Sequence, residues 1–321
     1  MTATNKGDGS IPWVSADTLR SALSTSEAAD ALTSALRDPA GLPASPRRTV
    51  IDSGTGKFLT MPTAADTGAG AKLVTVQPAN PPRGLPLING VFVLFSADRL
   101  EPIALFDGAA VTRLRTPAVS MVATRLLARG DSTHLVVFGA GVQALAHVHA
   151  MRSTRPIERI TIVSPGESGG ALVDHLRRLD FDAVRGESGA VEDADLVCTC
   201  TTASDPVFDG AALSKGAHVN ATGSFQPTTR EIDEVLLNRS IVVVEDRESA
   251  LCEAGDLMLP VESGAFEADS IAGDLREVAS GAVGRISGEE ITTFKSVGCA
   301  WEDLVVVQAA WVRINREPNP S

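Results

Sequence analysis

LVVFGAGVQALAHVHAM, residues 135–151, is the stretch that decides the fold of this chain. An apolar run, Leu135 to Phe138, leads directly into the glycine-containing turn Gly139-Ala140-Gly141, and an alanine-rich helical pattern follows. Strand, glycine turn and helix in this order are typical of nucleotide-binding units, because the glycines allow a tight turn and a close approach to a pyrophosphate. Ala144 occupies the third glycine position, which the looser form of the fingerprint tolerates. The stretch predicts nucleotide binding, with a ligand-free strand-to-helix connection as the alternative.

The chain on the C-terminal side of residue 130 alternates between strand and helix patterns. Strands are expected at 134–138, 159–163, 195–199, 217–221 and 241–244. Alternation of this kind predicts an α/β fold of the Rossmann type, with a doubly wound parallel sheet and right-handed crossovers.

The N-terminal part has a different pattern. Two short helices are expected within 15–37, where Ser24 and Glu27 have capping-box spacing. Short β segments then succeed one another with few helices, which predicts an antiparallel or mixed sheet. These segments are expected at 57–61, 69–76, 90–96 and 102–106, followed by helices from 108 to 128 and from 300 to 312.

The composition limits the classes of partner. The chain has 321 residues, 44% of them hydrophobic and 21% charged, as in an ordinary globular protein of about two domains. A net charge of −12 argues against nucleic acid or an anionic membrane as partner. No apolar run is long enough to span a membrane, and the first 13 residues read as a disordered tail without a secretory signal, so a cytoplasmic protein is expected.

The four cysteines do not predict a metal site. Cys198 and Cys200 form a C-x-C pair with no second pair and no nearby histidine, which is a poor zinc pattern. They are interpreted as buried thiols.

Three cationic residues stand in unusual settings. Arg48 enters a strand after a proline-rich loop, Lys72 interrupts an apolar strand, and Arg115 lies in a helix. Burying the charge of Lys72 costs several kcal/mol unless the charge is paired. Each residue alone is consistent with a snorkelling or salt-bridged side chain. Together they suggest a pocket for a carboxylate, which favours an arginine fork and a lysine point charge.

Six motifs occur in order along the chain: MPTAADTGAGAKLVTVQPANPPRGLP (61–86), LEPIALFDGAAVTRLRTPAVSMVA (100–123), VVFGAGVQALAHV (136–148), ADLVCTCTTASDPVFDGAALSKGAHVNATG (194–223), REIDEVLL (230–237) and TTFKSVGCAWEDL (292–304). With them the chain resembles the ornithine cyclodeaminase/mu-crystallin family over nearly its whole length. The resemblance implies a discontinuous α+β domain, residues 1–122 with 299–321, for substrate binding and homodimer formation. It also implies a dinucleotide-binding domain at 123–298, with the active site in the cleft between the two.

The resemblance also assigns roles to individual residues. Arg48, Lys72 and Arg115 look like the family's contacts to the substrate carboxylate, with Arg47 as the competing match for Arg48. Lys72 is the expected catalytic residue, either joining the clamp or keeping the imine protonated. The implied cofactor contacts are Arg115, Thr116, Gly139, Gly141, Val142, Gln143, Ser164, Thr201 with Thr202, and a closing loop from Lys295 to Gly298.

One departure from the family pattern bears on the reaction. Members that cyclise ornithine resemble one another in an aspartate just after the glycine of the N-x-x-G motif. Here Ser224 and Phe225 follow Gly223, and a serine cannot act as a carboxylate base at neutral pH. The sequence therefore favours an NAD(P)H-dependent reductase of a small cyclic 2-imino acid, similar to members that reduce Δ1-pyrroline-2-carboxylate to the L-amino acid. An amino-acid dehydrogenase, an ornithine cyclodeaminase and a non-catalytic NADPH-binding protein of the crystallin type are the alternatives.

The nicotinamide preference is predicted from the end of the second strand. NAD-binding sites usually carry an acidic residue there, about 20 residues after the glycines. The chain has Ser164 instead, and Glu167 comes three residues later. A missing carboxylate removes repulsion against a 2′-phosphate, so NADPH is favoured and NADH stays open.

Overall fold

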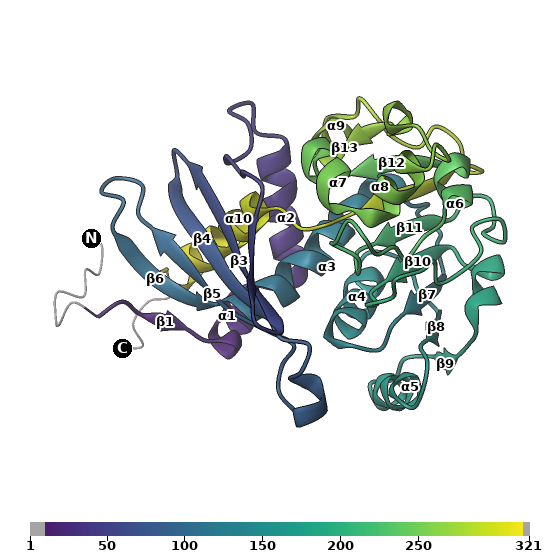
Figure 1. Cartoon of the computed structure of the whole chain (residues 1–321), viewed down its shortest axis with the longest axis horizontal. Helices are drawn as coiled ribbons and strands as arrows, with labels where there is room; N and C mark the ends of the chain where they lie inside the picture. The colour runs from purple at the N-terminus through teal and green to yellow at the C-terminus, as the bar shows by residue number, and fades with distance from the viewer. Residues whose placement is uncertain (1–9, 317–321) are drawn as a thin grey trace. The chain divides into compact units, whose positions relative to one another are not determined.

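The computed structural model describes residues 10–316 (Figure 1). They form two compact units: one runs to Arg115 and resumes at Cys299, and the other spans Thr116–Gly298. The domain boundary expected after residue 122 falls inside α3 (Gly108–Leu127), whose residues are divided between the units. Most of the expected N-terminal tail lies outside the described residues, and Trp13 at its end begins β1 (Trp13–Val14). No helix between residues 10 and 316 combines the length and apolar character that crossing a membrane requires.

The first unit contains a six-stranded mixed sheet in the order β1-β6-β5-β4-β3-β2. Only β1 and β6 (Pro102–Asp107) pair in parallel; the remaining neighbours are antiparallel, as the succession of β segments predicted. The other strands are β2 (Thr49–Ser53), β3 (Gly56–Ala65), β4 (Gly68–Val76) and β5 (Ile88–Phe95). Buried and less buried residues alternate along β4, so that Lys72 and Val74 lie on the face of the strand that is turned to the interior.

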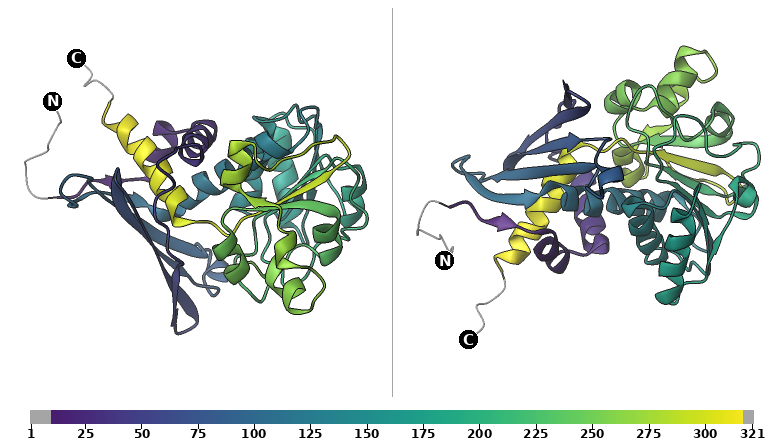
Figure 2. Two further views of the ribbon diagram at one scale, coloured as in Figure 1. Left: turned by 90° about the horizontal axis from the view of Figure 1, so that it is seen from above. Right: turned by 60° about the horizontal axis from the view of Figure 1, so that its bottom comes forward.

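Three helices complete the core of this unit (Figures 1 and 2). They are α1 (Ala16–Ala22), α2 (Thr25–Leu36) and the C-terminal α10 (Ala300–Ile314). The capping box predicted for Ser24 and Glu27 is present at the start of α2. α10 packs on α2 and on strands β3, β4 and β5, which joins the last helix to the N-terminal sheet.

The second unit is built on an eight-stranded, wholly parallel sheet in the order β13-β12-β14-β11-β10-β7-β8-β9. Its strands are β7 (His134–Phe138), β8 (Arg159–Val163), β9 (Ala183–Arg185), β10 (Leu196–Thr199), β11 (His218–Ala221), β12 (Ser240–Val244), β13 (Gly273–Asp274) and β14 (Ile291–Lys295). The helices between them are α4 (Val142–Arg152), α5 (Ser168–Arg178), α6 (Glu234–Arg239), α7 (Arg247–Glu253), α8 (Gly255–Glu262) and α9 (Leu275–Ser280). The predicted α/β fold, a Rossmann-type sheet with a discontinuous α+β domain, is confirmed.

The sequence pattern missed three strands of this sheet: β9, β13 and β14. The omission of β14 matters most, because this strand lies between β11 and β12 and makes them non-adjacent. Lys295 therefore ends a central strand, and the expectation that it begins a closing loop was wrong at that residue. The strand order reverses at β7 and β10, which is where nucleotides bind in open sheets of this type.

Candidate functional site

The turn between β7 and α4 requires a glycine at its first position. Gly139 has φ +106°, a conformation that L-residues with a side chain rarely adopt. A Cβ there would lie 2.6 Å from the carbonyl oxygen of Cys200, which follows β10. Gly139 thus brings the turn against the end of the neighbouring strand, at the switch point of the sheet.

Gly141, the second glycine of the turn, has a different setting. Its φ of −85° suits any residue, and a Cβ would meet nothing within 4 Å. Gly141 is the N-cap of α4, and it has no side chain with which to cap that helix. Open space at a helix N-terminus fits a pyrophosphate. Val142 and Gln143 open the helix beside this space, and the Val142 side chain is 62% exposed.

Thr201, beyond the end of β10, is held by a buried carboxylate. The backbone N–H of Thr201 donates to Glu231 Oε1 at 2.7 Å, and its hydroxyl donates to the same oxygen at 2.8 Å. Oε2 of Glu231 accepts from the Thr199 hydroxyl and from the backbone N–H groups of Gly223 and Ser224. One carboxylate thereby fixes the turns after both β10 and β11. Thr202 is exposed beside this network.

Glu231 belongs to a buried charged network. Asp256 Oδ1 accepts from the backbone N–H groups of Glu231 and Ile232, and Asp256 Oδ2 lies 2.7 Å from Lys295 Nζ. Lys295 Nζ also donates to the carbonyl of Ser224 at 2.6 Å. Burial raises the pKa of Glu231, and the positive charge of Lys295 opposes that rise. Lys295 is thus a member of the scaffold under the β10 and β11 turns.

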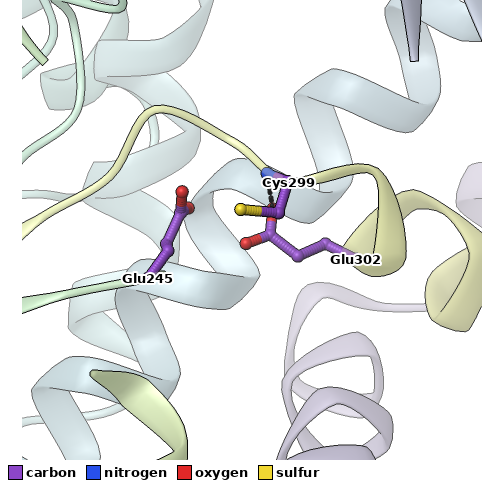
Figure 3. Close-up of side chains that lie close together, drawn as sticks. All are labelled: Glu245, Cys299 and Glu302. Carbon is purple, nitrogen blue, oxygen red and sulfur yellow. Dashed lines mark hydrogen bonds between the residues drawn. The ribbon is translucent and has the colours of Figure 1, made fainter. Parts of the chain in front are cut away.

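The loop from Ser296 to Gly298 is ordered by Glu245, which follows β12 and is one of the side chains drawn in Figure 3. The Glu245 carboxylate accepts from the Ser296 hydroxyl and from the backbone N–H groups of Val297 and Gly298. Gly298 has φ +83°, so a glycine suits this position. The loop is therefore held by a carboxylate that the sequence motif did not indicate.

Ser164 lies just beyond β8, as its position in the sequence predicted. Its hydroxyl is 3.3 Å from the Ser168 hydroxyl, within the turn that leads into α5. Among residues 10–316, neither of these two serine hydroxyls forms a hydrogen bond with the glycine turn. Thr116 lies on α3, where it is buried.

In the first unit, Lys72 on β4 is 2% exposed and its charge is paired. Its ammonium lies 2.8 Å from Asp303 Oδ2 and donates to Asp303 Oδ1 at 3.0 Å and to the Thr112 hydroxyl at 3.3 Å. Burial, with the charges of Arg115 and Arg48 acting in the same direction and Asp303 opposing them, lowers the pKa of Lys72 to about 8. Lys72 can therefore exchange a proton near neutral pH.

Arg115 on α3 shares the same carboxylate. Its Nε donates to Asp303 Oδ1 at 3.2 Å, and its Nη1 lies 3.4 Å from Glu302 Oε2. The Glu302 carboxylate also accepts from the backbone N–H of Cys299 and caps the start of α10 (Figure 3). The adjacent acids of α10 thus hold two of the three cations.

Arg48 completes the set. It precedes β2, is partly buried, and is one of the charges that lower the pKa of Lys72. Arg47 is exposed. Within one unit, the structure brings Lys72 and Arg115 together on Asp303 and places Arg48 close enough to act on the charge of Lys72.

Ser224 takes no part in an open site. It is buried, and its hydroxyl donates to the carbonyl of Thr229 at 2.6 Å and lies 2.8 Å from the Thr229 hydroxyl. Ser224 stands at the position where cyclising relatives resemble one another in an aspartate. Its hydroxyl is therefore hydrogen-bonded within its own loop.

Sequence reasoning missed the acidic partners of this chemistry: Glu231, Glu245, Asp256, Glu302 and Asp303. One signal was available for Glu302 and Asp303, which are adjacent acids at the start of a mainly apolar helix. A buried carboxylate at such a position requires a cationic partner. The others stand at ordinary helix-cap and turn positions, where acids are usually solvated.

Comparisons with known proteins agree with this architecture. The sequence profile of the ornithine cyclodeaminase/mu-crystallin family matches residues 14–317. A Δ1-pyrroline-2-carboxylate reductase of Bacillus cereus is 38% identical over 79% of this chain and 81% of its own length.

Two solved structures extend the comparison. The Δ1-pyrroline-2-carboxylate reductase of Thermococcus litoralis, in complex with NADH and L-proline, has a TM-score of 0.90 and 31% identity, covering 94% of this chain and 97% of its own. An archaeal alanine dehydrogenase dimer with bound NAD has a TM-score of 0.89 and 27% identity, covering 94% of this chain and 95% of its own.

Proposed function

The chain belongs to the ornithine cyclodeaminase/mu-crystallin family, and from that premise we propose that it reduces a small cyclic 2-imino acid to the L-amino acid with a nicotinamide hydride. The substrate class is that of Δ1-pyrroline-2-carboxylate, on which the named relatives act.

One observation carries this proposal: a buried ammonium lies beside arginines in the same unit. Lys72 and Arg115 contact the carboxylates of Asp303 and Glu302, and Arg48 is close enough to lower the pKa of Lys72. A cluster of three cations suits an anionic substrate. A 2-imino acid presents the matching pair of groups, a carboxylate and an adjacent basic nitrogen.

In the proposed mechanism, Arg48 and Arg115 hold the substrate carboxylate and Lys72 gives a proton from Nζ to the imine nitrogen. A nicotinamide, when bound, would supply the hydride for the imine carbon. The N–H and C–H bonds that form account for one proton and one hydride, so the product is the secondary amine. Lys72 then regains a proton from water, while Asp303 keeps Nζ in place throughout.

Gly139, Gly141 and the first residues of α4, Val142 and Gln143, are the proposed pyrophosphate site. The fit rests on the open space at Gly141 and on the N-terminus of α4, whose N-cap residue has no side chain. Thr116, Thr201 and Gly298 stay as proposed further contacts to the cofactor. We assign NADPH as the preferred form because Ser164 stands where an acidic residue would repel a 2′-phosphate.

The hydrogen bonds of the Ser224 hydroxyl favour reduction over cyclodeamination. Cyclising ornithine requires a group that handles amine and water protons, and the Ser224 hydroxyl is bound to Thr229. Reduction of an imine needs only the carboxylate clamp, one proton donor and a hydride.

We further propose that the protein is a homodimer. Every residue of the edge strand β2 is exposed, with Val50 47% and Ile51 52% exposed in the single chain. Adjacent apolar side chains on an open sheet edge favour association with a second copy.

The test is NADPH oxidation by the purified chain with Δ1-pyrroline-2-carboxylate. Parallel reactions contain NADH with the same imine, ornithine with NAD, and L-alanine with NAD. We expect turnover with the imine and none with ornithine or alanine. Proline formed from ornithine, or NADH formed from alanine, would instead identify a cyclodeaminase or an amino-acid dehydrogenase. Tight NADPH binding without turnover on any substrate would contradict an enzymatic role.

A further inference from the structure

Arg185 is a cation that the sequence did not connect with the cofactor. It is the last residue of β9, and in the register of the sheet it lies opposite Ile162 of β8. Its Nη2 donates to the carbonyl oxygen of Ser164 at 3.2 Å and to that of Gly166 at 2.6 Å. A residue distant in sequence thus places a guanidinium on the turn after the second strand of the dinucleotide fold.

The charge of Arg185 is not neutralised by a carboxylate. Within residues 10–316 its only polar contacts are these two carbonyls, and the side chain is exposed. A guanidinium has five N–H donors in a fixed fork. Two belong to Nη2, which anchors the side chain, and Nε and Nη1 carry the remaining three. An anchored arginine with unused donors is preorganised for an anion, because little side-chain entropy is lost on binding.

Hydroxyl groups on the same turn add further donors. Ser164 Oγ and Ser168 Oγ lie 3.3 Å apart, and their bonds to the Pro165 carbonyl oxygen are long, at 3.5 and 3.4 Å, so that a stronger acceptor can replace it. Hydroxyls beside a guanidinium form a donor set that suits a phosphate.

We propose that Arg185, with Ser164 and Ser168, binds the 2′-phosphate of the adenosine ribose and makes the protein selective for NADPH. The assignment rests on the proposed function, since the adenosine ribose of a dinucleotide lies at the end of the second strand. Sequence inspection finds no arginine directly after β8, and the neighbouring strand supplies one.

Glu167 is the competing group on this turn. It is exposed and precedes α5, where a carboxylate would accept the 2′-hydroxyl of NADH and repel a 2′-phosphate. The two residues therefore make opposite predictions about cofactor preference, and a pair of variants separates them.

The experiment is calorimetric titration of the full-length chain at fixed ionic strength with four probes: NADPH, NADH, adenosine 2′,5′-bisphosphate and adenosine 5′-monophosphate. The two adenosine fragments report on the phosphate without any nicotinamide chemistry. The variants are Arg185→Ala, Arg185→Lys and Glu167→Gln. Arg178→Ala is the matched control, because it removes the same charge at the C-terminal end of α5, away from the Ser164 turn.

We expect Arg185→Ala to weaken NADPH and the bisphosphate by about 10- to 100-fold, as the loss of a charge-assisted contact implies. NADH and the monophosphate should change by less than about threefold. Arg185→Lys should recover part of the affinity, and Arg178→Ala should match the wild type.

Equal losses for phosphorylated and unphosphorylated probes, or no loss at all, would overturn the assignment of Arg185. A second result would also overturn it: the wild type binds NADPH more weakly than NADH, and Glu167→Gln lowers the affinity for NADH alone. That result would leave the proposed reduction intact. Failure of the wild type to bind either dinucleotide would overturn both this assignment and the proposed function.

Discussion

Lys72 carries its charge at a position from which water is excluded. Moving an ammonium into a protein interior costs several kcal/mol, and a carboxylate with good geometry offsets much of that cost. The Asp303 carboxylate lies 2.8 Å from the Lys72 ammonium and raises the pKa of Lys72, whereas the charges of Arg115 and Arg48 lower it. The balance leaves the pKa of Lys72 at about 8, so the residue can both hold and release a proton at physiological pH.

Replacing Lys72 by methionine keeps most of the side-chain volume and removes the proton donor. We expect kcat to fall by about 10²- to 10⁴-fold, which is the usual contribution of general acid catalysis. Dinucleotide affinity should change by less than threefold, because the glycine turn belongs to the other compact unit. Steady-state rates and calorimetry on the same preparation check both statements, and wild-type rates would remove Lys72 from the mechanism.

The pH profile of the reaction should depend on Asp303. If Lys72 must be protonated to act, kcat/KM falls as the pH rises through its pKa of about 8. Asp303 raises that pKa, so Asp303→Asn should move the alkaline limb toward lower pH, by about one to three units.

The measurement is kcat/KM between pH 6 and 10 for the wild type and Asp303→Asn. Glu302→Gln serves as a comparison, since Glu302 pairs with Arg115, whereas the Lys72 ammonium pairs with Asp303. An unchanged limb in Asp303→Asn, or a shift toward higher pH, would show that Lys72 does not set the profile.

At the scale of secondary structure, the turn between β7 and α4 contains two glycines with separable roles. Gly139 adopts a left-handed conformation against the Cys200 carbonyl, and Gly141 leaves space in front of α4. The first requirement comes from the fold itself, and the second from the proposed pyrophosphate site.

Alanine substitution at each position should separate these roles. Gly139→Ala should lower the free energy of unfolding by roughly 2–4 kcal/mol, from backbone strain and the close contact together. Gly141→Ala should change it by less than about 1 kcal/mol, because its φ is allowed for alanine. Gly141→Ala should nevertheless weaken dinucleotide binding at least about tenfold.

Urea unfolding measures the free energy of unfolding of the two variants, and calorimetric titration measures their dinucleotide affinity. A Gly141→Ala protein that binds NADPH as the wild type does would exclude this turn as the pyrophosphate site.

Glu231 acts at the same scale, since one side chain connects two turns that follow different strands. Its carboxylate accepts backbone N–H groups from Thr201 after β10 and from Gly223 and Ser224 after β11. Gly223 has to be a glycine here, because a Cβ would lie 2.4 Å from Glu231 Oε1. The position of Thr201 is therefore set by an acid 30 residues away in the sequence.

At the scale of the whole molecule, the exposed edge strand β2 bears on assembly. We expect light scattering after gel filtration to give twice the mass of one chain. Ile51→Asp places a charge on the edge and should yield monomers, whereas Ile286→Asp should not, because Ile286 is 92% exposed elsewhere. A monomeric wild type, or a dimeric Ile51→Asp protein, would contradict an interface at β2.

The sequence alone determined the local features of this protein. The strands at 134–138 and 159–163, the glycine turn and the capping box at Ser24 were predicted where they occur, because apolar periodicity and turn chemistry are local properties. The unusual settings of Arg48, Lys72 and Arg115 were also visible, since a charge in an apolar strand is a local anomaly.

Only the tertiary structure decided which groups pair with these charges. Lys72 meets Asp303 across 231 positions of sequence, and Arg185 reaches the Ser164 turn from a neighbouring strand. β14 is a five-residue strand whose polar threonines and lysine hid it from the apolar pattern, and its insertion between β11 and β12 depends on sheet pairing. The partner of a buried charge and the neighbour of a strand are set by how the chain packs, because residues distant in sequence supply them.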